Sequence, residues 1–372
     1  MKKLLFIIGT RPEAIKLAPL IHEAQRTPLD FELKIIVTGQ HQSLLHPILA
    51  FFDIQADYTL QLENTSLSSF AAHLLLALAP IFEQEIPDAV IVQGDTSSAY
   101  VGALAAFYQR LPVVHIEAGL RTFQRYSPFP EELNRVMISR LASWHCTPTS
   151  KATHQLLQEG IAAETICESG NTVIDALFYA QARILRQAPP TVLQLQQHLE
   201  SVTLPEKPMV LVTVHRRENF GERLLTICRA LRAFAQMGTH QLIFPVHPNP
   251  KVQEPVYALL EDVPNITLLE PLPYEAFVYL LQQVQGIITD SGGIQEEATA
   301  LGIPTIVLRQ VTERSEALAS EVIQLCAIEQ DDIIQALSTI GTKEVAPQTI
   351  FGTGQASKKI IKFIDQQLPL RR

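Results

Sequence analysis

Clusters of small polar and charged residues follow several apolar stretches of this sequence, and their types suit phosphate binding. The stretch Thr289–Ala298 reads TDSGGIQEEA and directly follows an apolar run. Asp290 or Ser291 could cap a helix at this point. Gly292 and Gly293 would let the backbone approach a ligand and turn its free N–H groups toward it. The sequence therefore predicts a phosphate site at the start of a helix.

Two adjacent glutamates follow these glycines. On a helix, Glu296 and Glu297 would point about 100° apart, so we expect only one of them to face the ligand. A carboxylate one turn beyond a phosphate site is well placed to bind the hydroxyls of a ribose. The simpler alternative is a tight turn whose glutamates only complement the helix dipole.

Cationic residues lie at the ends of other apolar runs, where they could bind the same phosphates. Arg11 and Lys16 follow the first run, and His215–Asn219, which reads HRREN, follows a later one. Arg314 comes after the run that succeeds the glycine pair, whereas His247 in FPVHPNP is expected to order its own loop. The protein is acidic overall, so basic residues gathered at these places favour a phosphate ligand over a solvated surface.

Carboxylates in the first half of the chain are candidates for proton transfer. Asp95 follows a glycine and precedes Thr-Ser-Ser, so it could instead cap a helix. Glu117 ends the run PVVHIEA and should be buried, which is costly unless the carboxylate is paired or used. Glu131 could simply pair with Arg135 one helical turn later. Carboxylates of tunable pKa beside phosphate-binding cations suit proton transfer next to a phosphate leaving group.

The apolar runs that must position these residues are typical of parallel strands joined by helices. A first series covers residues 4–9, 33–38, 89–94 and 112–118, and a second covers 209–215, 241–246, 266–271, 286–290 and 304–308. Open α/β sheets bind ligands beyond the carboxyl ends of their strands. We therefore expect an α/β protein with two Rossmann-like, doubly wound domains and an interdomain cleft that receives the polar clusters.

The domain boundary is expected near Gly170, where ESGNT precedes a helical pattern that Asn171 or Thr172 can cap. Residues 1–170, joined by an amphipathic C-terminal helix within 355–372, would form the domain that carries the acid/base carboxylates. Residues 171–354 would form the domain that binds the phosphates. A chain of 372 residues is long enough for two such domains.

Composition and cysteine spacing argue against several other classes of protein. The net charge of -9 disfavours a broad nucleic-acid surface. Cys146, Cys167, Cys228 and Cys326 form no CxxC pair, which indicates neither a metal site nor a disulfide framework and fits a reducing cytoplasm. The apolar N-terminus is expected to be a buried strand. The apolar tract 70–82 is too short to cross a bilayer, so no membrane segment is expected.

Together the polar clusters resemble one family over residues 3 to about 355. GTRPEAIKLAPL, TGQH, QGDTSSA, HIEAGLRT, YSPFPEELNR, GNTVIDAL, HRRENFGERL, DSGGIQEEA and TERSEA look like the bacterial non-hydrolysing UDP-N-acetylglucosamine 2-epimerases. The resemblance implies a GT-B fold with the nucleotide-sugar between two domains. It also implies interconversion of UDP-N-acetylglucosamine and UDP-N-acetylmannosamine, without a cofactor or metal, by elimination of UDP to 2-acetamidoglucal and re-addition.

The resemblance also implies roles for individual residues. Asp95, Glu117 and Glu131 match the acid/base positions, with Arg135 supporting them, and which carboxylate serves which sugar face stays open. His215 matches a histidine that contacts the UDP phosphates and assists departure. The other implied UDP-binding positions are Arg11, Ser291, Gly292 and Gly293 for phosphate, with Lys16 as support, Glu297 for ribose, Phe277 for uracil, and Arg314.

Departures from the family pattern concern a second, activating nucleotide-sugar site and the tail. Many members carry an Arg-Gln pair near the position of LENTSLSSF, residues 62–70, and that pair is absent here. Gln42, Arg216 and His247 match other parts of the second site. We therefore expect the usual form of allosteric activation to be missing. Ser315, Phe351 and Thr353 replace the family's usual proline, tyrosine and aspartate without touching the chemistry.

Three other functions compete with the epimerase. A hydrolysing relative would release free N-acetylmannosamine and UDP, and a GT-B glycosyltransferase would need an acceptor. A catalytically silent nucleotide-sugar sensor ranks last, because Asp95, Glu117 and Glu131 are all present. A cytoplasmic homodimer that binds neither nucleic acid nor membrane is expected for the epimerase.

Overall fold

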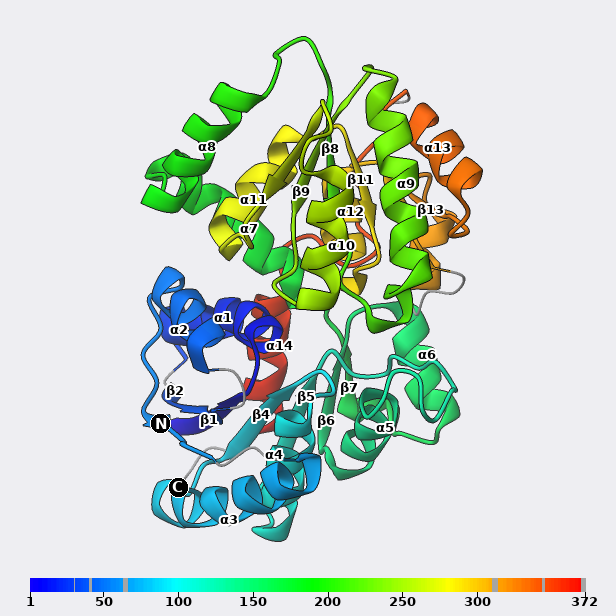
Figure 1. Ribbon diagram of the computed structural model, residues 1–372. Coiled ribbons are helices and arrows are strands. Elements are labelled where there is room, and N and C mark those ends of the chain that lie inside the picture. Colours follow the sequence, from blue (N-terminus) through cyan, green and yellow to red (C-terminus); the bar gives the residue numbers. More distant parts are fainter. Residues whose placement is uncertain (30, 40–41, 63–65, 310–313, 343–344, 369–372) are drawn as a thin grey trace. The chain divides into compact units, whose positions relative to one another are not determined.

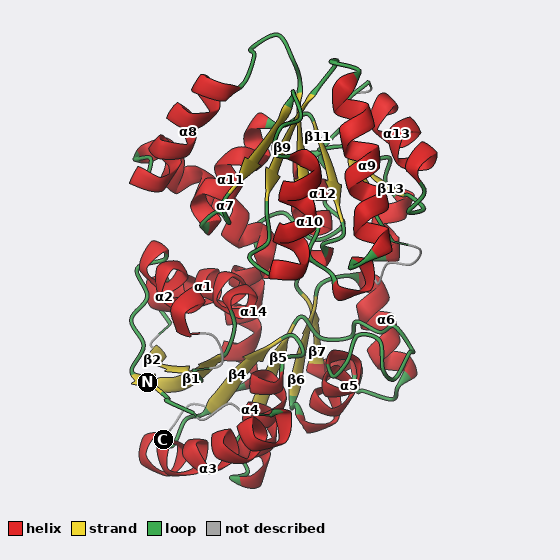
Figure 2. Ribbon diagram, in the orientation of Figure 1, coloured by secondary structure: helices red, strands yellow, loops and turns green. Residues whose placement is uncertain are grey.

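The computed structural model describes residues 1–29, 31–39, 42–62, 66–309, 314–342 and 345–368, without the side chains of residues 42–44, 315 and 319. The chain forms two compact units, Met1–Ala176 with Phe351–Arg372 and Leu177–Ile350. Each unit is a parallel sheet with helices packed on it, as Figures 1 and 2 show.

The first unit contains a seven-stranded sheet in the order β3-β2-β1-β4-β5-β6-β7, and every described strand pair is parallel. In that order the strands are β3 (Tyr58–Thr59), β2 (Phe31–Val37), β1 (Lys2–Ile8), β4 (Ala89–Gln93), β5 (Val113–Ile116), β6 (Trp144–Thr147) and β7 (Ile166–Glu168). Its helices are α1 (Arg11–Arg26), α2 (Gln42–Phe51), α3 (Leu67–Glu85), α4 (Ser97–Tyr108), α5 (Glu131–Leu141), α6 (Ser150–Gln158), the 3-10 turn η1 (Ala163–Thr165) and α14 (Ala356–Gln367).

The apolar N-terminus forms the central strand β1, as predicted. Its side chains from Leu4 to Ile8 are fully buried, because neighbouring strands flank β1 and helices cover both faces of the sheet. The C-terminal helix α14 packs against α1 in the same unit. A salt bridge of 2.7 Å from Lys2 Nζ to Asp365 Oδ1 ties this helix to the start of β1.

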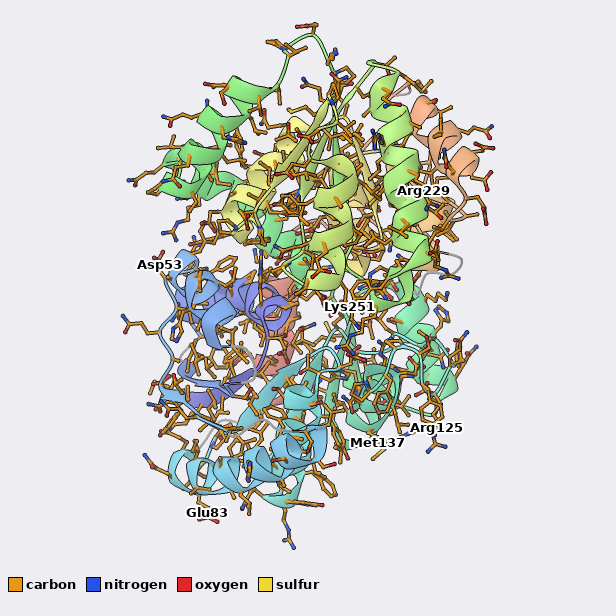
Figure 3. All side chains as sticks on the ribbon, in the orientation of Figure 1. Asp53, Glu83, Arg125, Met137, Arg229 and Lys251 are labelled. Atoms are coloured by element: carbon orange, nitrogen blue, oxygen red, sulfur yellow. The ribbon has the colours of Figure 1, made fainter. Side chains whose placement is uncertain are left out.

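Helix α3 corrects one expectation from the sequence. The apolar tract 70–82 lies within a helix of 19 residues, which is long and apolar enough to cross a membrane by length and composition alone. Phe70, Leu74 and Leu78 recur every fourth residue and pack in the core of the first unit, as the core helix of a globular protein does. Glu83, labelled in Figure 3, lies on the exposed side of this helix.

The second unit contains a six-stranded sheet in the order β10-β9-β8-β11-β12-β13, again with parallel pairs. The strands are β10 (Ile266–Leu269), β9 (Gln241–Pro245), β8 (Met209–Thr213), β11 (Gly286–Thr289), β12 (Thr305–Val307) and β13 (Ile323–Leu325). Its helices are α8 (Pro190–Val202), α9 (Glu222–Gln236), α10 (Pro250–Leu260), α11 (Tyr274–Gln283), α12 (Gly292–Leu301) and α13 (Gln330–Thr339), with 3-10 turns η2 (Arg217–Asn219) and η3 (Ser315–Ala319). Helix α7 (Thr172–Arg186) begins in the first unit and continues into the second.

The predicted α/β class with two doubly wound parallel sheets is confirmed. All nine strands expected from the apolar runs are present, whereas β3, β6, β7 and β13 were not predicted. These four strands read YT, WHCT, ICE and IQL, so polar residues interrupt each of them and none shows a run of Val, Ile and Leu. One consequence is that Cys146 and Cys167, far apart in sequence, are direct partners across β6 and β7.

Candidate active site

Both sheets have a point at which the strand order reverses, and the polar clusters follow the strands at these points. In the first unit β1 lies between β2 and β4, so the turns after β1, β4 and β5 lie at one edge of the sheet. In the second unit β8 and β11 are the neighbouring pair at the reversal. Parallel sheets bind ligands beyond the carboxyl ends of such strands. The structure therefore presents two candidate half-sites, one in each unit.

Glu117 is the most strongly held carboxylate of the first half-site. Its side chain is only 7% exposed, which confirms the predicted burial. Lys16 Nζ donates to both carboxylate oxygens at 2.6 and 2.7 Å, and Asn171 Nδ2 donates to Oε1 at 2.9 Å. Gln93 Nε2 also donates to Glu117 Oε2. Three residues from three different segments thus donate hydrogen bonds to the Glu117 carboxylate, and one of them, Lys16, is a cation.

The backbone of Glu117 has a left-handed conformation, with φ of 64°. This conformation costs a non-glycine residue about 1 to 2 kcal/mol. Such strain is typical of functional sites, where the surrounding structure holds it in place. It turns the chain sharply at the end of β5, and Glu117 is thereby directed to Lys16 and Asn171.

Asp95 and Arg135 form the second charged pair of this half-site. Arg135 NH2 lies 2.7 Å from Asp95 Oδ2, and Asn134 Nδ2 donates to the Asp95 carbonyl oxygen at 2.9 Å. Thr96, not Asp95, is the N-cap of α4, since its side chain accepts from Ala99 N at 3.1 Å. The Asp95 carboxylate is therefore held toward α5 and is not used to cap its own helix.

Burial raises the pKa of Asp95. The nearby Arg135 guanidinium opposes this shift, while the negative charges of Glu117 and Glu131 reinforce it. The result is an aspartic acid whose pKa lies above its ordinary value, so it accepts a proton more readily than an exposed aspartate. This property suits a group that exchanges protons during a reaction.

Glu131 begins α5 and does not form the simple ion pair that its spacing from Arg135 allowed. Arg135 instead contacts Asp95 and lies 3.5 Å from Glu132 through NH1 and Oε2. Glu131 Oε2 is buried and has no hydrogen-bond partner among the described residues. A buried carboxylate oxygen without a partner costs free energy unless it is protonated or bound by a ligand. Glu131 therefore remains a candidate for proton transfer.

Three further residues position this half-site: Glu132, which directly follows the candidate Glu131, Asn171, which was expected only as a helix cap, and Gln93, which was not singled out from the sequence. Glu132 accepts from Thr122 N and Phe123 N at 2.9 to 3.0 Å and so anchors the loop that precedes α5. Gln93 and Asn171 bind Glu117, as described above. All three lie within the quoted motifs YSPFPEELNR, QGDTSSA and GNTVIDAL, and each is a polar residue at or next to the end of a strand or helix.

Glu13 joins the turn after β1 to the turn after β4. Its Oε2 accepts from Gly9 N at 3.0 Å and from Thr10 N at 2.6 Å, while Thr96 Oγ1 donates to Oε1 at 2.7 Å. A Cβ atom at Gly9 would lie 2.0 Å from Ser98 Oγ, so only glycine permits this close approach. Glu13 thereby fixes the segments that carry Arg11 and Asp95.

Glu13 makes stability depend on pH. Burial raises its pKa from 4.5 to about 7 despite these hydrogen bonds. As pH rises through this window the unfolded state releases the proton first, so the free energy of unfolding falls by up to roughly 3 kcal/mol. Glu13→Gln, which does not titrate, should therefore gain stability relative to the wild type between pH 5 and pH 8. Urea unfolding of both proteins at the two pH values measures this gain, and a difference independent of pH would refute it.

In the second unit the side chain of Asp290 holds the turn after β8. Asp290 is fully buried, and its carboxylate contacts His215 Nδ1 at 3.1 Å. It also accepts from His215 N, from Arg216 N at 2.9 Å and from Asn219 Nδ2 at 3.0 Å. Asp290 was expected as a possible helix cap, but its side chain turns away from α12 to this loop.

His215 is partly exposed, and its ring stacks on that of His247 with centroids 6.0 Å apart. His247 Nδ1 accepts from Asn249 N at 3.2 Å, which confirms that this histidine orders its own loop. Arg216 Nε donates to the Asp290 carbonyl oxygen at 2.8 Å. His215 and Arg216 of the HRREN motif are therefore anchored by one buried aspartate.

The start of α12 has the features expected of an anion site. Ser291 is the N-cap residue but makes no side-chain cap hydrogen bond. Gly292 and Gly293 are the first helical residues, and a Cβ atom on Gly293 would meet nothing within 4 Å. The N–H groups of a helix's first turn have no partners within the helix, and its dipole favours an anion there. A phosphate can approach Gly293 closely.

Both glutamates of α12 are buried, and which of them faces a ligand stays a prediction. Glu296 is buried, and its Oε1 accepts from Arg314 Nε at 2.6 Å. This salt bridge joins α12 to the segment after β12, so Arg314 contacts a carboxylate within its own unit. Glu297 is 6% exposed. Phe277 lies on α11 and packs partly buried against the core of the second unit.

Some predicted positions are only partly described. Arg11 is the first residue of α1 and is partly exposed. Gln42 begins α2, but its side chain lies outside the described part of the chain. The described residues contain no group of three or more His, Cys, Asp or Glu that could hold a metal ion.

Comparison with known proteins identifies the family. The profile of the UDP-N-acetylglucosamine 2-epimerase family matches residues 22–365. The chain belongs to the UDP-N-acetylglucosamine 2-epimerase family. The enzyme of that name from Campylobacter jejuni is 42% identical over 98% of this chain and 97% of its own length. The predicted resemblance is thereby confirmed.

Solved UDP-N-acetylglucosamine 2-epimerases also share the fold. The Neisseria meningitidis enzyme, bound to UDP-GlcNAc, is 39% identical with a TM-score of 0.92, covering 98% of this chain and 100% of its own. The Methanocaldococcus jannaschii enzyme, in complex with UDP-GlcNAc and UDP, is 31% identical with a TM-score of 0.85, covering 98% and 99% of the two chains. The predicted GT-B fold class is confirmed for this member of the family.

Proposed function

We propose that this protein interconverts UDP-N-acetylglucosamine and UDP-N-acetylmannosamine without net hydrolysis. The observation that carries the proposal is the carboxylate group of the first unit, in which Glu117 is held by Lys16 and Asp95 by Arg135. Family membership and relatives described as bound to UDP-GlcNAc or UDP support this substrate.

The carboxylates would act on carbon 2 of the sugar. Its proton is weakly acidic, so removing it requires a positioned base and the simultaneous departure of a stabilised leaving group. Glu117 is held by Lys16, Gln93 and Asn171, whereas Asp95 has a raised pKa and Glu131 has a buried oxygen without a partner among the described residues. We propose that these groups remove and return the proton on the two faces of the sugar, with 2-acetamidoglucal as the intermediate.

The second unit would bind and release UDP. Ser291, Gly292 and Gly293 would bind phosphate at the start of α12, and His215 would give a proton or hydrogen bond to the departing phosphate. Glu297 would bind the ribose, the role that the family resemblance implies for its position. Arg11 would contribute to phosphate binding, and Phe277 would contact uracil.

Incubation of the purified protein with UDP-N-acetylglucosamine in D₂O tests this proposal. We expect UDP-N-acetylmannosamine to form, with solvent deuterium at carbon 2 and little free UDP. Absence of both the product and the deuterium would refute the epimerase. Stoichiometric release of UDP with free N-acetylmannosamine would instead identify the hydrolysing reaction.

We also propose that the protein works as a homodimer in the cytoplasm and supplies N-acetylmannosamine units for cell-surface polysaccharide. Helices α3, α4 and α5 pack side by side in the first unit and expose large apolar side chains. These are Leu67, Leu76, Phe107, Tyr108, Leu133 and Met137, the last of which is labelled in Figure 3. A second copy would cover this surface, and sedimentation of the purified chain measures the association.

A further inference from the structure

The Asp290 carboxylate binds side chains as well as main-chain N–H groups of the loop after β8. Its carboxylate accepts from the main-chain N–H groups of His215 and Arg216 at 2.9 to 3.1 Å. It also binds two side chains, His215 Nδ1 at 3.1 Å and Asn219 Nδ2 at 3.0 Å. One fully buried carboxylate thus orients both the backbone and the imidazole of His215.

The position of Asp290 is set by the pairing of two central strands. Thr213 and Thr289 are register partners at the ends of β8 and β11, and their hydroxyls lie 2.6 Å apart. Asp290 N donates to the Thr213 carbonyl oxygen at 3.2 Å, which extends the pairing by one residue. Asp290 and His215 therefore lie just beyond the ends of two adjacent paired strands, and this pairing brings the two residues together.

Asp290 carries a negative charge despite its burial. Burial alone would raise its pKa, but the hydrogen bonds from His215, Arg216 and Asn219 outweigh this and hold the pKa below its ordinary value. A buried anion next to an imidazole favours a proton on the nearer nitrogen. The other groups that face this imidazole are His247, which stacks on it, and Arg216, the next residue.

We propose that Asp290 is a positioning residue that holds the His215 imidazole with a proton on Nδ1 and presents Nε2 at the opposite edge of the ring. This inference rests on the proposed function, because His215 gains its role from the departing UDP. With Nδ1–H donated to Asp290, a second proton at Nε2 creates an imidazolium that the carboxylate stabilises. That proton can then be given to the leaving phosphate oxygen and recovered when UDP adds back.

The substitution Asp290→Asn tests this role because it keeps the size of the side chain. One amide oxygen can still accept from the backbone N–H groups, but the negative charge is lost. We expect kcat to fall about 10- to 100-fold, the usual loss when the hydrogen-bond partner that orients a functional histidine is removed. KM should change much less, since the start of α12 stays intact.

A spectroscopic measurement separates positioning from a purely structural role. Protein labelled with ¹⁵N-histidine, with the His215 signal assigned by His215→Asn, reports which ring nitrogen carries the proton in the absence of substrate. We expect the neutral ring of the wild type to be protonated at Nδ1. In Asp290→Asn the ring should shift toward protonation at Nε2, the form favoured when no anion faces Nδ1.

Asp175→Asn is the matched control. Asp175 is also a buried aspartate that accepts from two main-chain N–H groups, Ala356 N at 3.2 Å and Ser357 N at 2.8 Å. It lies at the start of α7, in the first unit, whereas Asp290 lies in the second. We expect Asp175→Asn to lower the melting temperature without changing the His215 tautomer.

Each outcome decides between the alternatives. A wild-type His215 protonated at Nε2 would overturn the proposal even if Asp290→Asn failed to fold. An unchanged tautomer and kcat in a folded Asp290→Asn variant would also overturn it. A tautomer shift in a protein that shows no epimerisation would support the positioning role and count against the proposed function instead.

Discussion

Glu117→Gln should lower turnover by roughly 10² to 10⁴ while UDP binding is retained, because a general base contributes about that much to the rate. Glutamine has nearly the same shape and can still accept a hydrogen bond from Asn171, but its amide cannot take a proton from carbon 2. It also leaves the Lys16 ammonium without its anionic partner. Initial rates of epimerisation and calorimetric UDP titration measure the two quantities separately.

Glu85→Gln provides the matched control for this experiment. Glu85 is also a buried carboxylate of the first unit, paired with Lys3 at 3.0 Å and bonded to Tyr58 at 2.5 Å. Both variants remove one carboxylate from a buried ion pair, so both should lower the melting temperature. Only Glu117→Gln should lose turnover, and near-normal activity in that variant would disprove the assignment of Glu117 as a base.

Arg135→Met should lower both activity and stability. The substitution leaves Asp95 and Glu132 without their shared cation; because the Asp95 side chain is 25% exposed, the cost lies below the roughly 3 to 5 kcal/mol of a fully buried pair. Burial then raises the Asp95 pKa with less opposition, so a larger fraction of Asp95 is protonated at neutral pH. Urea unfolding measures the first effect, and the rate as a function of pH measures the second.

The pH profile of activity should shift in a definite direction in Arg135→Met. If the ionised form of Asp95 is required, the activity of Arg135→Met should rise at a higher pH than that of the wild type. Arg135→Lys keeps the positive charge but lacks the planar guanidinium, so it should recover part of the stability and most of the pH profile. A folded Arg135→Met variant with wild-type stability and an unchanged profile would contradict the role of this pair.

The sequence alone determined the class of fold and the identity of the main acid/base candidates. Short segments rich in Val, Ile and Leu predicted nine strands correctly, because burial on both faces of a parallel sheet favours such segments. The run before Glu117 likewise predicted a buried carboxylate, which the structure confirms.

Only the tertiary structure decided which residues are partners. Lys16 meets Glu117 across 101 positions, and Asp290 meets His215 across 75. Arg135 pairs with Asp95 and not with its helical neighbour Glu131. Asp290 binds the loop after β8 and does not cap α12. The physical reason is that these contacts depend on strand order, with β4 beside β1 and β11 beside β8. Hydrophobic periodicity marks each strand as buried but contains no information about which strand will lie next to it.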